Sequence, residues 1–259
     1  MSNDAMPPLA TRASGRSLVI RAWSFIRNWE LGIGNSPSPH GHFPPVKPVY
    51  RLTWLACRAY YRLWHRWRVL NPERLPLTGP VIIAANHSSY LDPPLIGSGV
   101  PRPINYLARE SLFRTRAFGW YLRQLNCVPV DRDGAGAAGL KGILDRLHDG
   151  GVVILFPEGT RSENGQLQPA RAGIGLTVIK SDAPVVPVRV FGTFEAWHRH
   201  QKLPRPHRVM VKYGVPMDFK ALREEAKTCP KPRLKVIYQE IADELMAAIA
   251  KLEPVRDAK

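Results

Sequence analysis

The chain has 259 residues, 44% of them hydrophobic, which suits one large domain or one domain plus an extension. Its three cysteines show no C-x-x-C spacing, which argues against a disulfide framework and a thiolate zinc site and favours a reducing compartment. Lys and Arg total 37 against 21 Asp and Glu, and this net charge of +16 attracts phosphates of a nucleic acid, an anionic lipid or a small molecule.

The N-terminal part of the chain reads as an extension, 1–48. Residues 1–16 are small and polar and are expected to be disordered. Apolar residues recur at helical spacing over 17–33, and a Pro- and Gly-rich linker follows over 32–48. Because Arg21 soon interrupts the first apolar run, we expect no signal peptide. No apolar run approaches the ~20 residues that a membrane-spanning helix needs.

A stronger helical pattern runs from Tyr50 to Leu70, within the segment 49–74. Its apolar residues follow the i, i+3, i+4, i+7 rule: Leu52, Leu55, Ala56, Ala59, Tyr60, Leu63, Trp64 and Trp67. Basic side chains fall mostly on the other side, as expected of an amphipathic helix in the headgroup region of an anionic membrane. A surface helix that packs its Trp and Leu residues on the core fits the same pattern. The first 80 residues hold eleven basic and three acidic residues, which favours the membrane.

Residues 75–259 alternate between strand and helix patterns and form the predicted catalytic domain. The predicted strands are 81–85, 104–108, 127–130, 152–156, 185–190 and 208–213, and the predicted helices are 93–98, 117–125, 140–148, 170–181 and 235–252. Such alternation predicts an α/β fold with a mixed, largely parallel sheet flanked by helices. Pro187 predicts that its strand lies at an edge or a bulge.

The first candidate site follows the apolar run 81–85 and reads Asn86-His87-Ser88-Ser89-Tyr90-Leu91-Asp92. Ligands bind at the carboxyl ends of strands in open α/β sheets. Four residues separate His87 from Asp92, so a tight turn can bring the carboxylate to the imidazole and make a general base. Asp92-Pro93-Pro94 also fits a helix start with Asp92 as N-cap, which leaves His87 as an ordinary loop histidine.

A second strand, 152–156, leads into a matching polar motif, Phe156-Pro157-Glu158-Gly159-Thr160-Arg161-Ser162. Gly159 permits a close backbone approach, and Arg161 offers a fork of donors for a phosphate or carboxylate. Glu158 can accept hydrogen bonds from substrate hydroxyls. The alternative is a Pro/Gly turn that a Glu158–Arg161 ion pair merely shapes. Arg132, after the strand 127–130, is either a further phosphate ligand or a surface charge.

Four segments in this order resemble the 1-acylglycerol-3-phosphate acyltransferase (lysophospholipid acyltransferase) family. They are Asn86–Asp92, Phe118–Arg123 continuing through Val128–Arg132, Phe156–Ser162, and Val185–Val188, and the likeness covers roughly residues 75–215. Bacterial members commonly carry a membrane-binding helical N-terminus. The chain departs from the family after Gln168-Pro169, where an aromatic and two basic residues are common and Ala170, Arg171 and Ala172 stand here. This departure bears on acyl-chain or donor preference.

The resemblance implies acyl transfer from acyl-CoA or acyl carrier protein to the sn-2 hydroxyl of lysophosphatidic acid, a step of phospholipid biosynthesis. His87 is expected to remove the hydroxyl proton and Asp92 to orient His87. The acceptor is expected to bind to Arg132, Glu158, Gly159, Thr160 and Arg161, of which the two arginines hold its phosphate. We expect no metal, no redox cofactor and no protein nucleophile, and an apolar tunnel that opens towards the membrane.

The expected location is peripheral, on the cytoplasmic face of a membrane such as the bacterial inner membrane, where an anionic surface supplies the lysophospholipid. Another acceptor, such as a lyso-ornithine lipid, would use the same base. A nucleic-acid-binding module would explain the charge, but the aromatic residues of 50–67 lie on the apolar stripe of a helix rather than on a reading surface. A lipid hydrolase is disfavoured because the sequence has no G-x-S-x-G nucleophile elbow.

Overall fold

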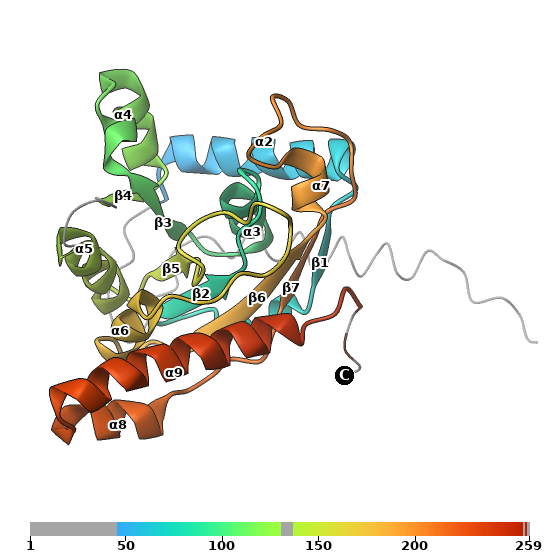
Figure 1. Ribbon diagram of the computed structural model, residues 1–259. Coiled ribbons are helices and arrows are strands. Elements are labelled where there is room, and N and C mark those ends of the chain that lie inside the picture. Colours follow the sequence, from blue (N-terminus) through green and yellow to red (C-terminus); the bar gives the residue numbers. More distant parts are fainter. Residues whose placement is uncertain (1–45, 131–136, 256, 258–259) are drawn as a thin grey trace, which may run out of the picture. The chain divides into compact units, whose positions relative to one another are not determined.

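The computed structural model describes residues 46–130, 137–255 and 257, which belong to one compact unit, Ser38–Lys259 (Figure 1). The helix predicted over 17–33 and the disorder predicted for 1–16 therefore lie outside the described residues. The described chain builds a seven-stranded sheet in the order β1-β7-β6-β2-β5-β3-β4. The strands are β1 Arg68–Leu70, β2 Val81–Ala85, β3 Ile104–Arg109, β4 Cys127–Val130, β5 Val152–Leu155, β6 Val185–Phe191 and β7 Met210–Tyr213.

All neighbouring strands in the sheet are parallel except β6 and β7. The five strands β2 to β6 thus run in one direction, and β1 and β7 run in the other. This confirms the predicted mixed, largely parallel α/β sheet. Because parallel strands share their direction, the carboxyl ends of β2, β3, β4, β5 and β6 lie at one edge of the sheet, where sequence analysis placed both polar motifs.

Helices cover both faces of the sheet (Figure 1). They are α2 Pro48–Trp64, α3 Asp92–Gly99, α4 Arg116–Gln124, α5 Ala137–His148, α6 Gly173–Ile179, α7 Thr193–Trp197, α8 Lys220–Thr228 and α9 Lys231–Ala250, with short 3₁₀ helices η1 Pro72–Arg74 and η2 Glu110–Phe113. Alternate residues of a strand point to opposite faces. In β2, Ile83 therefore packs in a core with Tyr61 of α2 and Leu95 of α3, whereas Ile82 packs in a second core with residues of α5, α6 and α9.

The helix predicted over 50–70 is shorter in the structure. It ends at Trp64, Arg66 adopts a left-handed conformation with φ of 46°, and Arg68–Leu70 forms the edge strand β1. The prediction was wrong here because the apolar residues after Trp64 continue the helical spacing. The pairing of β1 with β7, which lies about 140 residues further along the chain, decides the local structure instead.

The apolar stripe of α2 faces outward. Leu52, Leu55 and Leu63 are exposed, Leu63 to 84%, while Tyr50 and Tyr61 on the other side of the helix are buried. The structure thus excludes the alternative that the leucines of this stripe pack on the core. Of the helices in the described ranges, none combines the length and the apolar composition needed to cross a bilayer.

The strand with Pro187 is not at an edge, contrary to prediction, since β6 lies between β7 and β2. Pro187 aligns with Ala84 of β2, whereas the pairing with β7 covers only Val188–Phe191. Pro187 therefore stands just beyond the β6–β7 ladder, where its missing N–H leaves no ladder bond unmade.

One junction in the sheet is open. β3 pairs with β5 only at Ile104 and Asn105, and its later residues pair with β4 instead. Beyond these two pairs β3 and β5 diverge, which leaves space between them, one strand away from β2.

Candidate active site

The His87 turn is built on one buried carboxylate. His87 Nδ1 lies 2.8 Å from Asp92 Oδ2, and the same oxygen accepts the backbone N–H groups of Ser88 and Ser89, each at 2.7 Å. Asp92 is fully buried and is the first residue of α3, where the helix dipole favours a negative charge. An ionised carboxylate can only accept, so Nδ1–H donates to Asp92 and Nε2 is left as the free, basic nitrogen.

The helix-start interpretation of Asp92 is correct only in part. Asp92 does begin α3, but Leu91 is the N-cap, and no side chain caps the helix. The Asp92 carboxylate turns back to the preceding loop instead. It therefore organises the histidine turn as expected of the orienting member of a catalytic pair.

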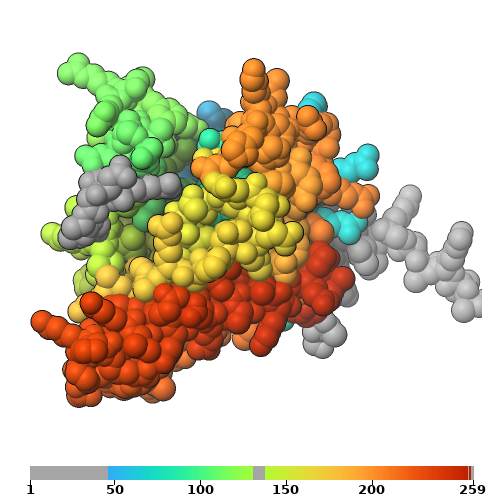
Figure 2. Space-filling view, in the orientation of Figure 1, coloured from blue at the N-terminus to red at the C-terminus, as the bar shows by residue number. Residues whose placement is uncertain are grey.

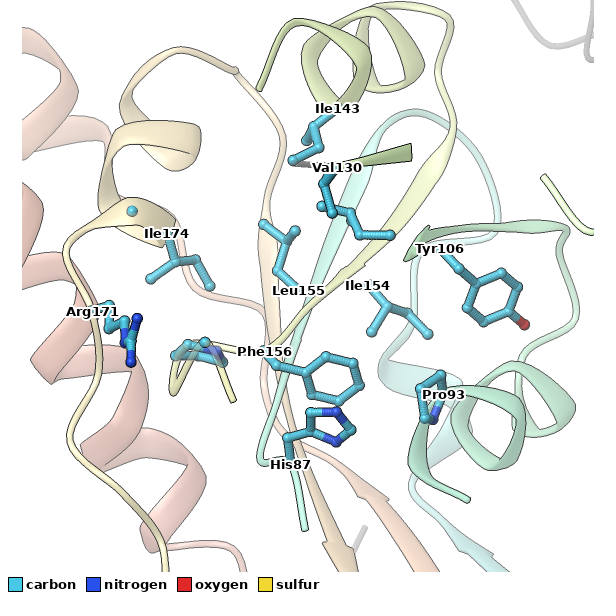
Figure 3. Close-up of a pocket in the computed structure, with 14 residues that line it drawn as sticks. His87, Pro93, Tyr106, Val130, Ile143, Ile154, Leu155, Phe156, Arg171 and Ile174 are labelled. Atoms are coloured by element: carbon cyan, nitrogen blue, oxygen red, sulfur yellow. The ribbon is translucent and has the colours of Figure 1, made fainter. Parts of the chain in front are cut away.

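The two predicted motifs meet at the backbone of His87. The His87 N–H donates to Glu158 Oε1 at 3.1 Å, and the His87 carbonyl accepts the N–H of Ser162 at 2.7 Å. The Phe156 ring stacks on the imidazole with centroids 4.0 Å apart and 19° between the planes (Figure 3). The segment Phe156–Ser162 thus fixes both the backbone and the ring plane of His87.

Glu158 is only 2% exposed. Burial raises its pKa to about 7, the nearby charge of Asp92 acts in the same direction, and hydrogen bonds from the backbone of His87 and Gln168 oppose the shift. Oε2 is buried and has no hydrogen-bond partner within the described residues. The alternative Glu158–Arg161 ion pair does not form among them either. The Glu158 carboxyl group therefore joins two loops of the protein, a role that sequence analysis missed.

Arg161 lies beside the histidine turn. Its Cζ atom sits 3.6 Å from the centroid of the Tyr90 ring, a cation–π contact, and its Nη1 is buried without a hydrogen-bond partner in the described part of the chain. This guanidinium group is held in place and still has hydrogens to donate to an anion. Arg132, the other predicted phosphate ligand, lies outside the described residues.

Gly159 and Thr160 lie on the loop between Glu158 and Arg161, and Thr160 is half-buried. Gly159 has φ of +71°, and a Cβ atom there would lie 2.8 Å from Cδ of Arg171. The positive φ favours glycine at this position, and a Cβ atom would displace the flexible side chain of Arg171. That Gly159 allows close approach of a substrate stays a prediction.

A cavity of about 300 Å³ opens beside His87, in the gap between β3 and β5 (Figure 3). Its wall is mostly apolar and includes Tyr106, Leu107, Val130, Ile143, Ile154, Leu155 and Ile174. The exposed side chain of Arg171 also borders the cavity. The space can take an alkyl chain whose reactive end reaches the imidazole.

The structure also shows contacts around the site that the sequence motifs do not predict. The amide side chain of Asn86 accepts the N–H of Val190 at 2.7 Å and donates to the Val190 carbonyl at 3.2 Å, which ties the ends of β2 and β6. Arg109 ends β3 at the same sheet edge and supplies another cation there. Within the described ranges, no three His, Cys, Asp or Glu side chains gather as they would around a metal ion.

Comparisons with known proteins agree with this geometry. Residues 66–191 match the Acyltransferase family model. The chain is 32% identical over 145 residues to the 1-acyl-sn-glycerol-3-phosphate acyltransferase of Bacillus subtilis, a match that covers 56% of this chain and 72% of that protein. It is 31% identical over 124 residues to the chloroplastic enzyme BAT2 of Brassica napus, of which the match spans 36%.

The crystal structure of the 1-acyl-sn-glycerophosphate (LPA) acyltransferase PlsC from Thermotoga maritima has a similar fold. The TM-score is 0.61 at 25% identity, and the match covers 80% of this chain and 81% of that one. Both His87 and the Phe156–Ser162 segment fall inside the region that the family model matches. The chain therefore belongs to the 1-acyl-sn-glycerol-3-phosphate acyltransferase family, and it is an acyltransferase.

Proposed function

We propose that the protein transfers a fatty acyl group from a thioester of CoA or acyl carrier protein to the sn-2 hydroxyl of lysophosphatidic acid, giving phosphatidic acid. The observation that carries this proposal is the hydrogen-bonded Asp92–His87 pair, of which His87 lines an apolar cavity. The names of the bacterial and plant relatives support this choice of acceptor.

In the proposed reaction, Nε2 of His87 takes the proton of the acceptor hydroxyl as its oxygen attacks the thioester carbonyl carbon. The carbon–sulfur bond breaks, and the leaving thiolate receives the proton from His87. Asp92 stabilises the imidazolium that exists between these two steps. Every proton is accounted for by one imidazole, so the reaction requires no further cofactor.

The acceptor phosphate is assigned to Arg161, because its Nη1 is free of hydrogen bonds within the described residues and a guanidinium group matches phosphate geometry. Arg132 is assigned the same role from the sequence. We assign the acyl chain to the cavity between β3 and β5. In this arrangement the apolar and anionic ends of the substrates bind to separate parts of the site, since Arg161 does not line this cavity.

The proposed location is the cytoplasmic surface of a membrane, with α2 at the lipid. The exposed leucines of α2 lie among exposed arginines, namely Arg51 and Arg62. α2 is also firmly joined to the site, because Trp54, Arg58 and Tyr61 donate hydrogen bonds to the carbonyls of Gly97, Ser98 and Leu91. Lipid contact at α2 would therefore bring the His87 turn close to its substrates.

The test is thiol release by the purified full-length protein with a panel of lysolipids and with both donor classes. Substitution of His87 by Ala should lower turnover about 10²–10⁴-fold, as expected for loss of a general base. His148→Ala, at the exposed end of α5, is the matched control and should keep wild-type turnover. A folded His87→Ala protein with near wild-type turnover would rule out the base. Fastest turnover with a lyso-ornithine lipid would reassign the acceptor.

A further inference from the structure

The segment that follows β3 carries an unexplained apolar surface. Leu112 of η2 and Phe118 and Trp120 of α4 are 44%, 44% and 55% exposed, and we call these three residues the α4 surface. α4 packs inward through the buried residues Gly119 and Leu122. Figure 2 shows this part of the chain, in green, standing out from the rest of the described surface. Three large apolar side chains exposed on one short segment of the chain mark a candidate interaction site.

The charges around the α4 surface indicate its partner. From η2 to the end of β4, residues 110–130 contain three arginines, Arg114, Arg116 and Arg123, and one acidic residue, Glu110. All three arginines are exposed. Tryptophan and phenylalanine side chains between guanidinium groups are typical of the interface between an anionic bilayer and water. A second copy of the chain is a poor partner, because the same arginines would face each other across a symmetric contact.

The α4 surface adjoins α2. Lys47, just before α2, donates to the carbonyl of Arg123 at 2.7 Å, and the hydroxyls of Thr53 and Tyr121 lie 3.1 Å apart. η2 begins directly after β3, at the sheet edge that also carries His87. The helices α4 and α2 thus lie side by side (Figure 1).

We infer that the α4 surface is a second membrane-binding element, which inserts Leu112, Phe118 and Trp120 among the headgroups of an anionic bilayer. The inference rests on the proposed function, in which the bilayer supplies the lysophosphatidic acid. One helix lying on a membrane leaves the protein free to roll about the helix axis. Contact at both α2 and α4 removes this freedom and directs the His87 edge towards the lipid.

The test uses the full-length protein with Phe118→Ser and Trp120→Ser combined, and flotation with vesicles of phosphatidylglycerol and phosphatidylethanolamine. Because both large apolar side chains would leave water on insertion, partition should fall at least about tenfold in the double variant, even if insertion is only partial. Val236→Ser replaces an exposed apolar residue on α9 and should leave partition unchanged. Arg114→Gln with Arg116→Gln should weaken binding to these vesicles more than to phosphatidylcholine vesicles.

Thermal unfolding without lipid shows whether the double variant is folded. If it partitions like the wild type, the α4 surface does not contact lipid. If the wild type is a dimer in sedimentation velocity and the variant a monomer, the surface binds a second copy and the inference falls. Turnover should fall more on vesicle-borne than on monomeric short-chain lysophosphatidate. A wild type that acylates neither form would refute the proposed function, while flotation would still decide the α4 surface.

Discussion

Two buried carboxyl groups bind three consecutive backbone N–H groups at the His87 turn. Glu158 accepts from His87, and Asp92 accepts from Ser88 and Ser89. These hydrogen bonds hold the turn in one conformation, which fixes the position of the proposed base, the His87 imidazole, before a substrate binds. The pairing of His87 with Asp92 could be predicted from the sequence, because a five-residue turn suffices to form it.

The roles of Glu158 and Arg161 could be predicted only in part. The motif predicts that Glu158 accepts hydrogen bonds from substrate hydroxyls. In the structure, its carboxyl group is buried and accepts the backbone N–H of His87 on another loop. Arg161 was recognised as a candidate anion ligand, but its contact with Tyr90 was not. In each case the partner lies about 70 residues away in the sequence, and only the sheet brings the two strand ends together.

Replacement of Glu158 by Gln should change the pH dependence of stability. The folded-state pKa of about 7 exceeds the ordinary value of 4.5, so between these pH values the folded protein holds a proton that the unfolded chain has lost. Wild-type stability therefore falls as pH rises from about 4.5 to 7, by at most about 1.4 kcal/mol for each pH unit between the two pKa values. Glu158→Gln should lack this loss in urea denaturation at pH 5 and pH 8. The exposed Glu253→Gln is the control, and equal pH effects in both variants would contradict the argument.

Replacement of Arg161 by Ala should chiefly raise the KM for lysophosphatidate. A hydrogen bond to a charged group contributes about 1.5–3 kcal/mol, so the expected rise is about tenfold or more. With a monoacylglycerol, which has no phosphate, the same substitution should have little effect in steady-state assays. Arg199→Ala, which breaks an ion pair with Glu163, is the matched control. An unchanged KM for lysophosphatidate would remove Arg161 from the phosphate site.

At the scale of elements, strands buried on both faces were predictable, whereas the edge strand β1 and the polar helix α8 were not. Continuous apolar runs identify β2 and β5, because helices cover both sides of these strands. β1 has only three residues, and α8, Lys-Ala-Leu-Arg-Glu-Glu-Ala-Lys-Thr, has few apolar residues to reveal a period. Tertiary contacts stabilise both elements, and no local signal reports them.

The helix α6 allows a test of the cavity. Ile174 lines it, and a Phe at this position adds bulk that shortens the space available to an acyl chain. Ile174→Phe should shift the preferred donor towards shorter chains in initial-rate assays over a series of acyl-CoA thioesters. Ile179→Phe changes the same helix outside the cavity and should keep the wild-type profile. An unaltered profile for Ile174→Phe would place the acyl chain elsewhere.

At the scale of the whole molecule, the net positive charge and the direction of the parallel strands both bear on the proposed membrane binding. The chain carries a net charge of +16, and arginines of α2 and α4 are exposed. A field of this sign would attract an anionic surface before any apolar side chain made contact, as the proposed membrane location requires. Composition alone predicts a phosphate-bearing partner, and the fold adds that η2 and α4 follow β3 at the sheet edge that carries His87.

Binding to anionic vesicles should therefore weaken with salt. The screening length falls from about 10 Å at 0.1 M salt to about 3 Å at 1 M, so the attraction between the arginines and the bilayer shortens in range. Flotation with phosphatidylglycerol vesicles should show a steep decline over this range. Phosphatidylcholine vesicles, which carry no net charge, are the control. Salt-independent binding to both would attribute membrane affinity to the apolar side chains alone.

The hydrogen bonds of the His87 backbone have a consequence for inhibition. Its N–H and its carbonyl both belong to the segment Phe156–Ser162, through Glu158 and Ser162. A molecule that displaced this segment would leave the imidazole chemically unchanged. It would break the hydrogen bonds that hold the His87 backbone, and with them the orientation of the imidazole. Compounds that bind between the two loops would thus inhibit the enzyme without resembling either substrate and without contacting Nε2 of His87.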